Sequence, residues 1–294
     1  LNMKNAVSMT VIGSIVLLGL YLFIKFISAD YVQYVLLCYF IFVGSVGVSE
    51  LFDFVFEKFA SKEKFVLFTV PVINYKLETS KAEILGMTVG AVISIAWAIT
   101  RHWMLNNFLA MCLTIVAVGE LTAPSVKIGG VMLIGLFLYD IFWVFGSEVM
   151  ITVATNIDGP IKFIFPKDGH LFFPEKVSLL GLGDIAIPGI YIALMKRVDT
   201  AFNNGSKYFN VTMIGYFVGL LATFVVMHVF SHGQPALLYL VPALLISAAL
   251  YSISRGEFMK LWNYHDPVDE TEEESSEEES SEEEGNEENK DKDD

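Results

Sequence analysis

Long apolar runs separated by short polar stretches dominate this chain. Each run has roughly 17–23 residues, the length that an α-helix needs to cross the ~30 Å hydrocarbon core of a bilayer. The runs cover residues 7–27, 31–52, 84–100, 103–119, 128–147, 179–195, 208–230 and 235–253. The pattern predicts an all-α polytopic membrane protein with eight transmembrane helices. The two helices that flank Arg101 and His102 must be joined by a very tight turn.

Composition supports a membrane protein and separates a tail from it. Of 294 residues, 54% are hydrophobic and the mean hydropathy is +0.56, which is outside the range of ordinary soluble domains. The net charge of −14 arises after residue 266, in a segment that includes TEEESSEEESSEEE. Such a segment has too little apolar surface to fold. We therefore expect a transmembrane domain over residues 1–265 and a disordered acidic tail over residues 266–294.

Basic residues predict the orientation, because Lys and Arg accumulate in cytoplasmic loops. With eight spans, both ends of the chain share one side of the membrane. That side holds Lys4, Lys58, Lys62, Lys64, Lys76, Lys81, Lys127, Lys196, Arg197, Lys207, Arg255 and Lys260, whereas the other holds Lys25, Arg101, Lys162, Lys167 and Lys176. Both ends are therefore expected in the cytosol. The sequons at Asn204 and Asn210 then fall on the cytosolic side and should carry no glycan.

Two aspartates lie inside apolar runs. They are Asp140, in GLFLYDIFWVFG, and Asp184, in GLGDIAIPG. An ionised carboxylate at the bilayer centre costs at least ~2.5–3.5 kcal/mol on insertion scales, so such a residue indicates a functional site. Asp140 comes eight residues before Glu148, and Asp184 eight residues after Lys176. On adjacent antiparallel helices both carboxylates would lie ~12 Å below the same non-cytosolic surface.

Matched depth predicts that the two carboxylates face each other. Two like charges a few ångströms apart cannot both ionise, so the pair would share one proton near neutral pH. One carboxylate can then take a proton from a water molecule while the other donates one to a carbonyl oxygen. This chemistry is that of an aspartic protease.

The residues around Asp184 favour an interrupted helix. Pro188 has no N–H, and its ring crowds the carbonyl group of Asp184, four residues earlier. Gly181 and Gly183 lower the cost of non-helical backbone and leave room for another chain. We therefore expect the helix to be broken at its entrance, where backbone must be buried in protein or face water.

The motifs YD at 139–140, GLGD at 181–184 and QPALLYLVP at 234–242 resemble, in order and spacing, the three signatures of the GxGD intramembrane aspartyl proteases, which include presenilin and signal peptide peptidase. The longer stretches YDIFWVFGSEVMITVA and MHVFSHGQPALLYLVPA are similar to the signal peptide peptidase branch. The similarity runs from about residue 10 to about residue 265, through successive predicted spans.

The resemblance implies a presenilin-like bundle with a short β-hairpin before the GLGD helix, and a transmembrane protease domain over residues 1–265. It implies nine spans with a luminal N-terminus, so the first span of the family is expected to be absent from this chain. It makes Asp140 and Asp184 the catalytic pair. The positions that it implies at the substrate are Tyr139, Leu179, Leu180, Gly181, Leu182, Gly183, Pro235, Ala236 and Leu237. Independently, Pro235 at the start of an apolar run is typical of the first helical residue.

Substrate binding requires unwinding, because a transmembrane helix hides its amide bonds and unpaired backbone groups in hydrocarbon cost several kcal/mol. An edge strand of the enzyme could pair with the unwound segment. The candidate strands are 176–180, leading into GLGD, and 161–165 in the preceding loop. That loop, about 149–177, is long enough to predict a gate or substrate-binding element.

The resemblance implies remnant signal peptides and type II transmembrane segments as substrates, in the endoplasmic reticulum membrane. The lipid bilayer is a partner, and a homo-oligomer or other membrane proteins of that compartment stay open. The final KDKDD resembles a dilysine retrieval signal. No cofactor, metal or nucleic acid is expected: Cys38 and Cys112 read as small apolar residues, and His228 with His232 lacks further ligands.

Other functions of the chain, and purely structural roles of single residues, remain as alternatives. Paired acids and broken helices also mark proton- or ion-coupled transporters, although no second GLGD-like break occurs in residues 1–120. A proteolytically silent chaperone is a third possibility. Glu50, Asp53 and Glu120 are expected at membrane interfaces. Tyr139 could equally pack against neighbouring helices, and the glycine pairs 86/90 and 215/219 have the spacing of close helix packing.

Overall fold

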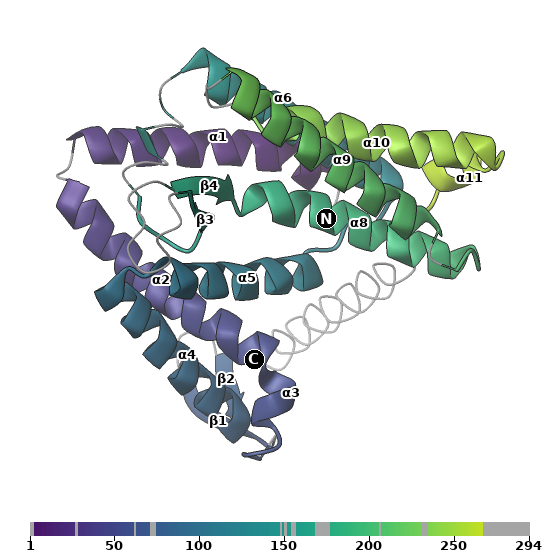
Figure 1. Cartoon of the computed structure of the whole chain (residues 1–294). Coiled ribbons are helices and arrows are strands. Elements are labelled where there is room, and N and C mark those ends of the chain that lie inside the picture. The colour runs from purple at the N-terminus through teal and green to yellow at the C-terminus, as the bar shows by residue number, and fades with distance from the viewer. Residues whose placement is uncertain are drawn as a thin grey trace, which may run out of the picture. The chain divides into compact units, whose positions relative to one another are not determined.

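Each of the eight predicted spans contains one long helix. A computed structural model describes residues 3–26, 29–61, 63–70, 75–147, 149, 152–153, 157–167, 177–205, 207–230 and 235–266. The long helices are α1 (Met3–Phe26), α2 (Ala29–Leu51), α4 (Lys81–Thr100), α5 (Trp103–Glu120), α6 (Val126–Gly146), α8 (Gly183–Ala201), α9 (Lys207–Phe230) and α10 (Leu237–Ser254) (Figure 1). The acidic tail, KDKDD and His232 lie outside the described residues, as does the side chain of His228.

Six helices in the described part of the chain are long and apolar enough to cross a membrane, namely α2, α4, α5, α6, α9 and α10. Helix α1 contributes a shorter apolar stretch, Thr10–Phe26. Helix α8 contains Asp184 near its start and Lys196, Arg197 and Asp199 near its end. The architecture is that of a polytopic, mainly helical membrane protein, as predicted.

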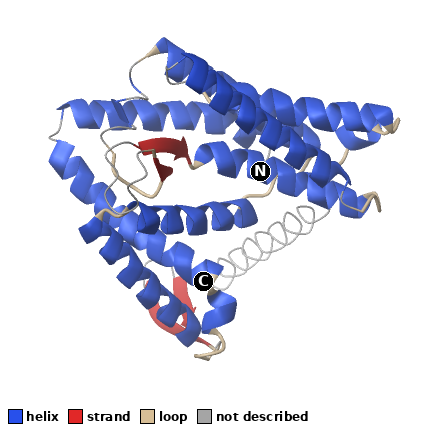
Figure 2. Ribbon diagram, viewed as in Figure 1, coloured by secondary structure: helices blue, strands red, loops and turns tan. Residues whose placement is uncertain are grey.

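Two antiparallel hairpins interrupt the helical pattern (Figure 2). The predicted one joins β3 (Lys162–Pro166) to β4 (Val177–Gly181) and leads directly into α8. The other joins β1 (Lys64–Val70) to β2 (Tyr75–Ser80) and was not predicted. Its signal was in the sequence, since KFVLFTV is rich in the β-branched and aromatic residues that strands favour. Two short helices, α3 (Asp53–Phe56) and α11 (Phe258–Trp262), complete the described elements.

The chain forms two compact units, which are described separately. Unit 1 contains the described residues of 3–11, 122–138 and 190–266, and unit 2 those of 12–121 and 139–189. Helices α1, α6 and α8 each contribute residues to both units. Asp140, Asp184 and the β3–β4 hairpin all belong to unit 2, whereas the PAL segment, Pro235–Leu237, belongs to unit 1.

Unit 2 is built on close packing of α2 against α4 around one apolar core. The core contains Phe40, Val48, Trp97, Leu109, Cys112 and Trp143 among its buried residues. A Cβ atom at Gly90 would come within 2.5 Å of the Ser45 carbonyl oxygen, and one at Gly86 would collide with Ser49. The predicted small-residue spacing therefore lets two helix backbones approach each other.

The turn between α4 and α5 is as tight as predicted. Arg101 ends α4 in the left-handed conformation, with φ 51°, and its N–H donates to the Trp97 carbonyl. His102 then caps α5, its Nδ1 atom accepting from the Met104 N–H at 3.2 Å. Two residues thus reverse the chain between two candidate membrane spans.

Unit 1 uses the same packing device in α9 and α10. A Cβ atom at Gly215 or Gly219 would meet the α10 backbone at 2.9 Å. The buried carboxylate of Asp199 accepts the N–H groups of Tyr208 and Phe209 at 2.9 and 2.8 Å. These N–H groups lie in the first turn of α9, where they have no partner within the helix. The buried position of Asp199 is therefore explained by its role in capping the start of α9.

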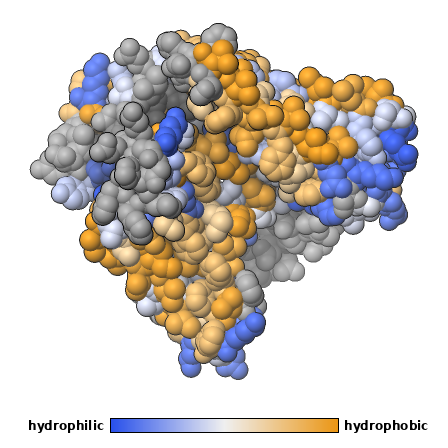
Figure 3. Space-filling view, in the orientation of Figure 1, coloured by the Kyte–Doolittle hydropathy of each residue, from blue (hydrophilic) through white to orange (hydrophobic). Residues whose placement is uncertain are grey.

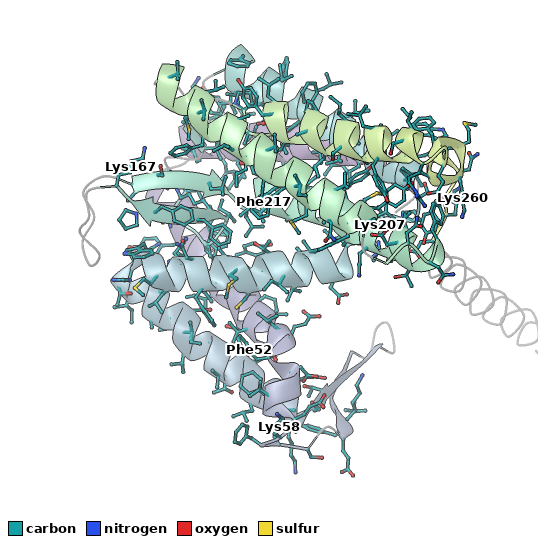
Figure 4. All side chains as sticks on the ribbon, turned by 45° about the vertical axis from the view of Figure 1, so that its right-hand side comes forward. Phe52, Lys58, Lys167, Lys207, Phe217 and Lys260 are labelled. Carbon is teal, nitrogen blue, oxygen red and sulfur yellow. The ribbon has the colours of Figure 1, made fainter. Side chains whose placement is uncertain are left out.

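The surface agrees with a protein surrounded by lipid. Large apolar side chains are exposed along the helices, including Ile99 at 78%, Val92 at 63% and Phe42 at 62%. In Figure 3 polar residues gather at the end of unit 2 where α3 lies, beyond an apolar flank. Lys58 and Lys167, predicted on opposite membrane faces, lie at opposite ends of this unit (Figure 4).

Candidate active site

Asp140 is held in the interior of α6. The helix spans Val126–Gly146 and is mainly apolar, and Asp140 is its one acidic residue. The side chain is only 4% exposed. A buried carboxylate in such a helix is costly unless other groups compensate it, so its presence indicates a functional role.

Asp184 lies where a strand changes into a helix. Strand β4 ends at Gly181, α8 begins at Gly183, and Asp184 is in the first helical turn. The Gly181 N–H donates to its carboxylate. N–H groups without helical partners and the positive end of the helix dipole both stabilise an anion at this position. Asp184 is only partly buried, so it is more accessible than Asp140.

The structure brings the two predicted acids together. Asp140 is close enough to Asp184 for their carboxylates to interact electrostatically, although 43 positions separate them in sequence. Both residues lie in unit 2. The two acids thus lie in one unit and influence each other electrostatically, while their action as a pair stays a prediction.

The entrance to the Asp184 helix differs in one respect from the sequence prediction. The predicted span began at residue 179, but residues 177–181 form β4 and the helix starts at Gly183. Pairing with β3 satisfies the backbone groups of this segment, as hydrocarbon requires of any non-helical backbone. Pro188 lies inside α8, so the Asp184 carbonyl lacks its usual helical donor.

Gly181 is required by the proximity of the carboxylate. A Cβ atom at this position would come within 3.1 Å of Asp184 Oδ2 and 3.6 Å of its Cγ. A Cβ at Gly183 would be 3.7 Å from Ile187 Cδ1, which is an ordinary contact. The first glycine of GLGD thus makes room for the acid itself, beyond the backbone freedom that was predicted.

The register of the hairpin determines which backbone groups face outward. Phe163 pairs with Leu180, and Phe165 pairs with Ser178. Because the Leu182 N–H donates to the Ile161 carbonyl at 2.9 Å, these residues exchange hydrogen bonds across the hairpin. The alternate residues Lys162 and Ile164 therefore direct their backbone groups away from β4. Leu179 and Gly181 direct theirs away from β3.

Two asparagines at this hairpin were missed by the sequence analysis. Asn106 and Asn107 of α5 hydrogen-bond to the backbone of β3. Their signal was the presence of two adjacent amides in an apolar span. Nothing in the sequence indicated their partners, which lie 56 and 57 residues away.

Tyr139 packs against neighbouring side chains. Its ring lies 6.4 Å from that of Trp143, and a Cβ atom at Gly13 of α1 would be 3.7 Å from its Cε2. Trp143 Nε1 donates to Oγ of Ser14, which also lies on α1, at 3.2 Å. The packed alternative for Tyr139 is thus the one that the described contacts support.

The PAL segment leads into α10. Pro235 and Ala236 are buried and precede the first helical residue, Leu237. Pro235 is thus two residues before the helix rather than its first residue, a difference within the usual uncertainty of helix ends. The Pro235 carbonyl accepts the Leu238 N–H at 3.3 Å, so the proline begins the turn that starts the helix.

The remaining acidic candidates have other surroundings. Glu50 is exposed, and with Asp53 it lines a hollow of about 380 Å³ beside Ser49 and Glu83. Glu50 also interacts electrostatically with Glu120. Glu83 caps α4 by accepting the Ser80 N–H at 3.2 Å. Within the described ranges no three His, Cys, Asp or Glu residues lie together as a metal site would require.

Comparison with known proteins gives consistent matches. The family model for signal peptide peptidase matches residues 1–268. The signal peptide peptidases of mouse and human are 37% and 35% identical to this chain, covering 92% and 90% of it and 76% and 73% of their own lengths. Intramembrane protease 2 of Caenorhabditis elegans is 42% identical over 65% of this chain and 44% of its own length.

The family model spans all of the described residues, including both aspartates, the β3–β4 hairpin and the PAL segment. Its extent agrees with the range of similarity expected from the three motifs. This chain is a multi-pass membrane protein that belongs to the signal peptide peptidase family.

Proposed function

We propose that this chain is an intramembrane aspartyl protease that hydrolyses peptide bonds within transmembrane segments, with Asp140 and Asp184 as the catalytic pair. The proposal is carried by the electrostatic interaction of these two acids within one unit of a chain that belongs to the signal peptide peptidase family. Both residues match the positions that the motif resemblance assigns to catalysis.

The mechanism follows from two carboxylates that share one proton. The ionised member removes a proton from water, and the resulting hydroxide oxygen bonds to the scissile carbonyl carbon. The protonated member donates its proton to the carbonyl oxygen. Collapse of the tetrahedral intermediate breaks the C–N bond as the amine leaves with a proton, so one water is consumed per bond. The partial exposure of Asp184 supports water access from its side.

Strand β4 supplies the proposed binding element. The outward N–H and carbonyl of Leu179 and the outward carbonyl of Gly181 can pair with an unwound substrate segment, as in strand addition at a sheet edge, whereas the Gly181 N–H is bonded to Asp184. Gly181 also touches the Asp184 carboxylate. A segment paired along this edge would therefore have its peptide bonds beside the acid. Leu180, Leu182 and Gly183 complete the proposed substrate contacts in unit 2. Tyr139 and, separately in unit 1, the PAL segment are proposed from their motif positions alone.

The proposed substrates are remnant signal peptides and type II transmembrane segments in the endoplasmic reticulum membrane, with the C-terminus of the chain in the cytosol. The names of the mouse and human relatives support the first class. The distribution of Lys and Arg supports the orientation.

The test is cleavage of a signal-peptide substrate by the purified protein in detergent. Asp140→Asn and Asp184→Asn keep the side-chain shape but cannot share a proton, so each should lower kcat at least about a thousandfold, a loss of ~4 kcal/mol in transition-state stabilisation. Thermal unfolding of both variants should stay near that of the unsubstituted protein. Cleavage that persists in either variant would exclude the proposed pair.

A further inference from the structure

Asn106 and Asn107 occupy the outer edge of β3 in the way a third strand would. Asn107 Nδ2 donates to the Ile164 carbonyl at 2.8 Å, and its Oδ1 accepts the Ile164 N–H at 2.8 Å. Asn106 Nδ2 donates to the Lys162 carbonyl at 2.7 Å. One side-chain amide thus satisfies both backbone groups of one residue, as a neighbouring peptide unit would.

The bonded groups are those that the hairpin register turns away from β4. Lys162 and Ile164 alternate with Phe163 and Phe165, which pair with β4. The next outward position is Pro166, which has no N–H to donate. We call this outer edge of β3 closed, because Asn106 and Asn107 occupy the Lys162 carbonyl and both backbone groups of Ile164, and Pro166 offers no donor.

The outer edge of β4 is different. Leu179 is 45% exposed, and no described residue is bonded to its outward backbone groups. The hairpin thus has one closed edge, next to α5, and one open edge, next to Asp184. In hydrocarbon an open edge must be paired or covered, so a substrate strand would be stabilised only there.

We propose that Asn106 and Asn107 are positioning residues that select the β4 edge for substrate and fix the sheet relative to Asp184, so that they determine which peptide bond is cut. This inference rests on the proposed proteolytic function. Asn106 is 2% exposed, and a buried amide in a candidate membrane span is costly unless its hydrogen bonds are made. The hydrogen bonds to β3 compensate the cost of placing the two amides in α5.

Purified full-length Asn106→Leu/Asn107→Leu protein in detergent tests the inference with a transmembrane peptide substrate. Mass spectrometry of the products identifies the bonds cut, and initial rates give kcat and KM. We expect kcat/KM to fall about tenfold, mainly through KM, since three hydrogen bonds that position the sheet are lost. The cuts should spread to neighbouring peptide bonds. Asn107→Gln, which keeps the amide, should restore part of the single-bond pattern.

Thr114→Val is the matched control. Thr114 is buried in the same helix, but its hydroxyl donates to the Ala110 carbonyl within α5 and makes no bond to β3. This variant should cut the same bond as the unsubstituted protein. Hydrogen exchange at residues 162–166 gives a readout without proteolysis, because loss of Asn107 should speed exchange of the Ile164 amide.

The outcomes separate the two proposals. An unchanged cut site and KM in the double variant, with faster exchange in β3, would overturn the positioning role alone. Absence of cleavage by the unsubstituted protein would overturn the proposed function and this inference with it. If the double variant does not fold, Asn107→Leu carries the same test, since it keeps the Asn106 bond.

Discussion

At the scale of residues, one glycine and two acids account for most of the proposed chemistry. The sequence predicted Asp140 and Asp184 as a pair, because an unpaired acid in an apolar run has few structural uses. It could not show that Gly181 touches Asp184, which depends on where β4 ends. Nor could it link the α5 amides to β3, since periodicity within a segment carries no information about distant partners.

Gly181→Ala should impair catalysis through the carboxylate. The new Cβ would lie 3.1 Å from Asp184 Oδ2, so the acid must shift by a few tenths of an ångström. We expect kcat to fall about tenfold, since such constellations tolerate only ~0.5 Å of displacement. Steady-state kinetics on a signal-peptide substrate would measure this.

Two other glycines provide comparisons for Gly181→Ala. Gly183→Ala should lose less, because its nearest contact would be at 3.7 Å. A Cβ atom at Gly119 of α5 would have no atom within 4 Å, so Gly119→Ala should have wild-type kinetics. Equal losses in Gly181→Ala and Gly119→Ala would contradict the steric explanation.

At the scale of elements, hydrophobic runs predicted the eight long helices within a few residues, because burial in hydrocarbon and internal hydrogen bonding act on the whole run. The exception was α8, whose predicted start lay inside β4. An apolar stretch such as VSLLG fits a strand and a helix equally well. Its pairing with β3 determines that it forms a strand. The β1–β2 hairpin falls in a segment left as a connection between two predicted spans, although the composition of KFVLFTV favours a strand.

Proline substitutions in β4 separate its two edges. The Leu180 N–H belongs to the hairpin ladder, whereas the Leu179 N–H points away from β3. Leu179→Pro should therefore keep the hairpin and lower the cleavage rate about tenfold, by removing one donor to substrate. Leu180→Pro should disrupt both the hairpin and cleavage.

Hydrogen exchange in β3 reports the hairpin, and the cleavage rate reports substrate pairing. Leu179→Val keeps the N–H and serves as the control for the lost leucine side chain. If Leu179→Pro cleaved at the rate of Leu179→Val, pairing along the open edge would be excluded.

At the scale of the whole molecule, the distribution of basic residues predicts an orientation in the membrane that the fold alone does not indicate. Asn204 lies in the turn after α8, and Asn210 lies in the first turns of α9. Both are sequons at the end of unit 1 that we place in the cytosol. Glycosylation occurs only on the luminal side, so both asparagines should remain unmodified when the chain is made in endoplasmic reticulum membranes.

An endoglycosidase gel-shift assay checks this orientation. Lys167→Asn with Gly169→Thr creates a sequon at the opposite end of unit 2 from Lys58, on the side predicted to be luminal. This engineered sequon should be glycosylated and should shift on digestion. A shift that requires Asn204 or Asn210 would reverse the proposed orientation.

The junction between β4 and α8 contains a single residue, Leu182. So short a connection fixes the spacing between the strand and the first turn of the helix. The outward backbone groups of Leu179 and the carboxylate of Asp184 are therefore a fixed number of residues apart, because one residue leaves the strand little room to slip against the helix. If a substrate strand pairs with Leu179, we expect the same spacing along its backbone between the paired residue and the bond that is cut, whatever side chains the substrate carries.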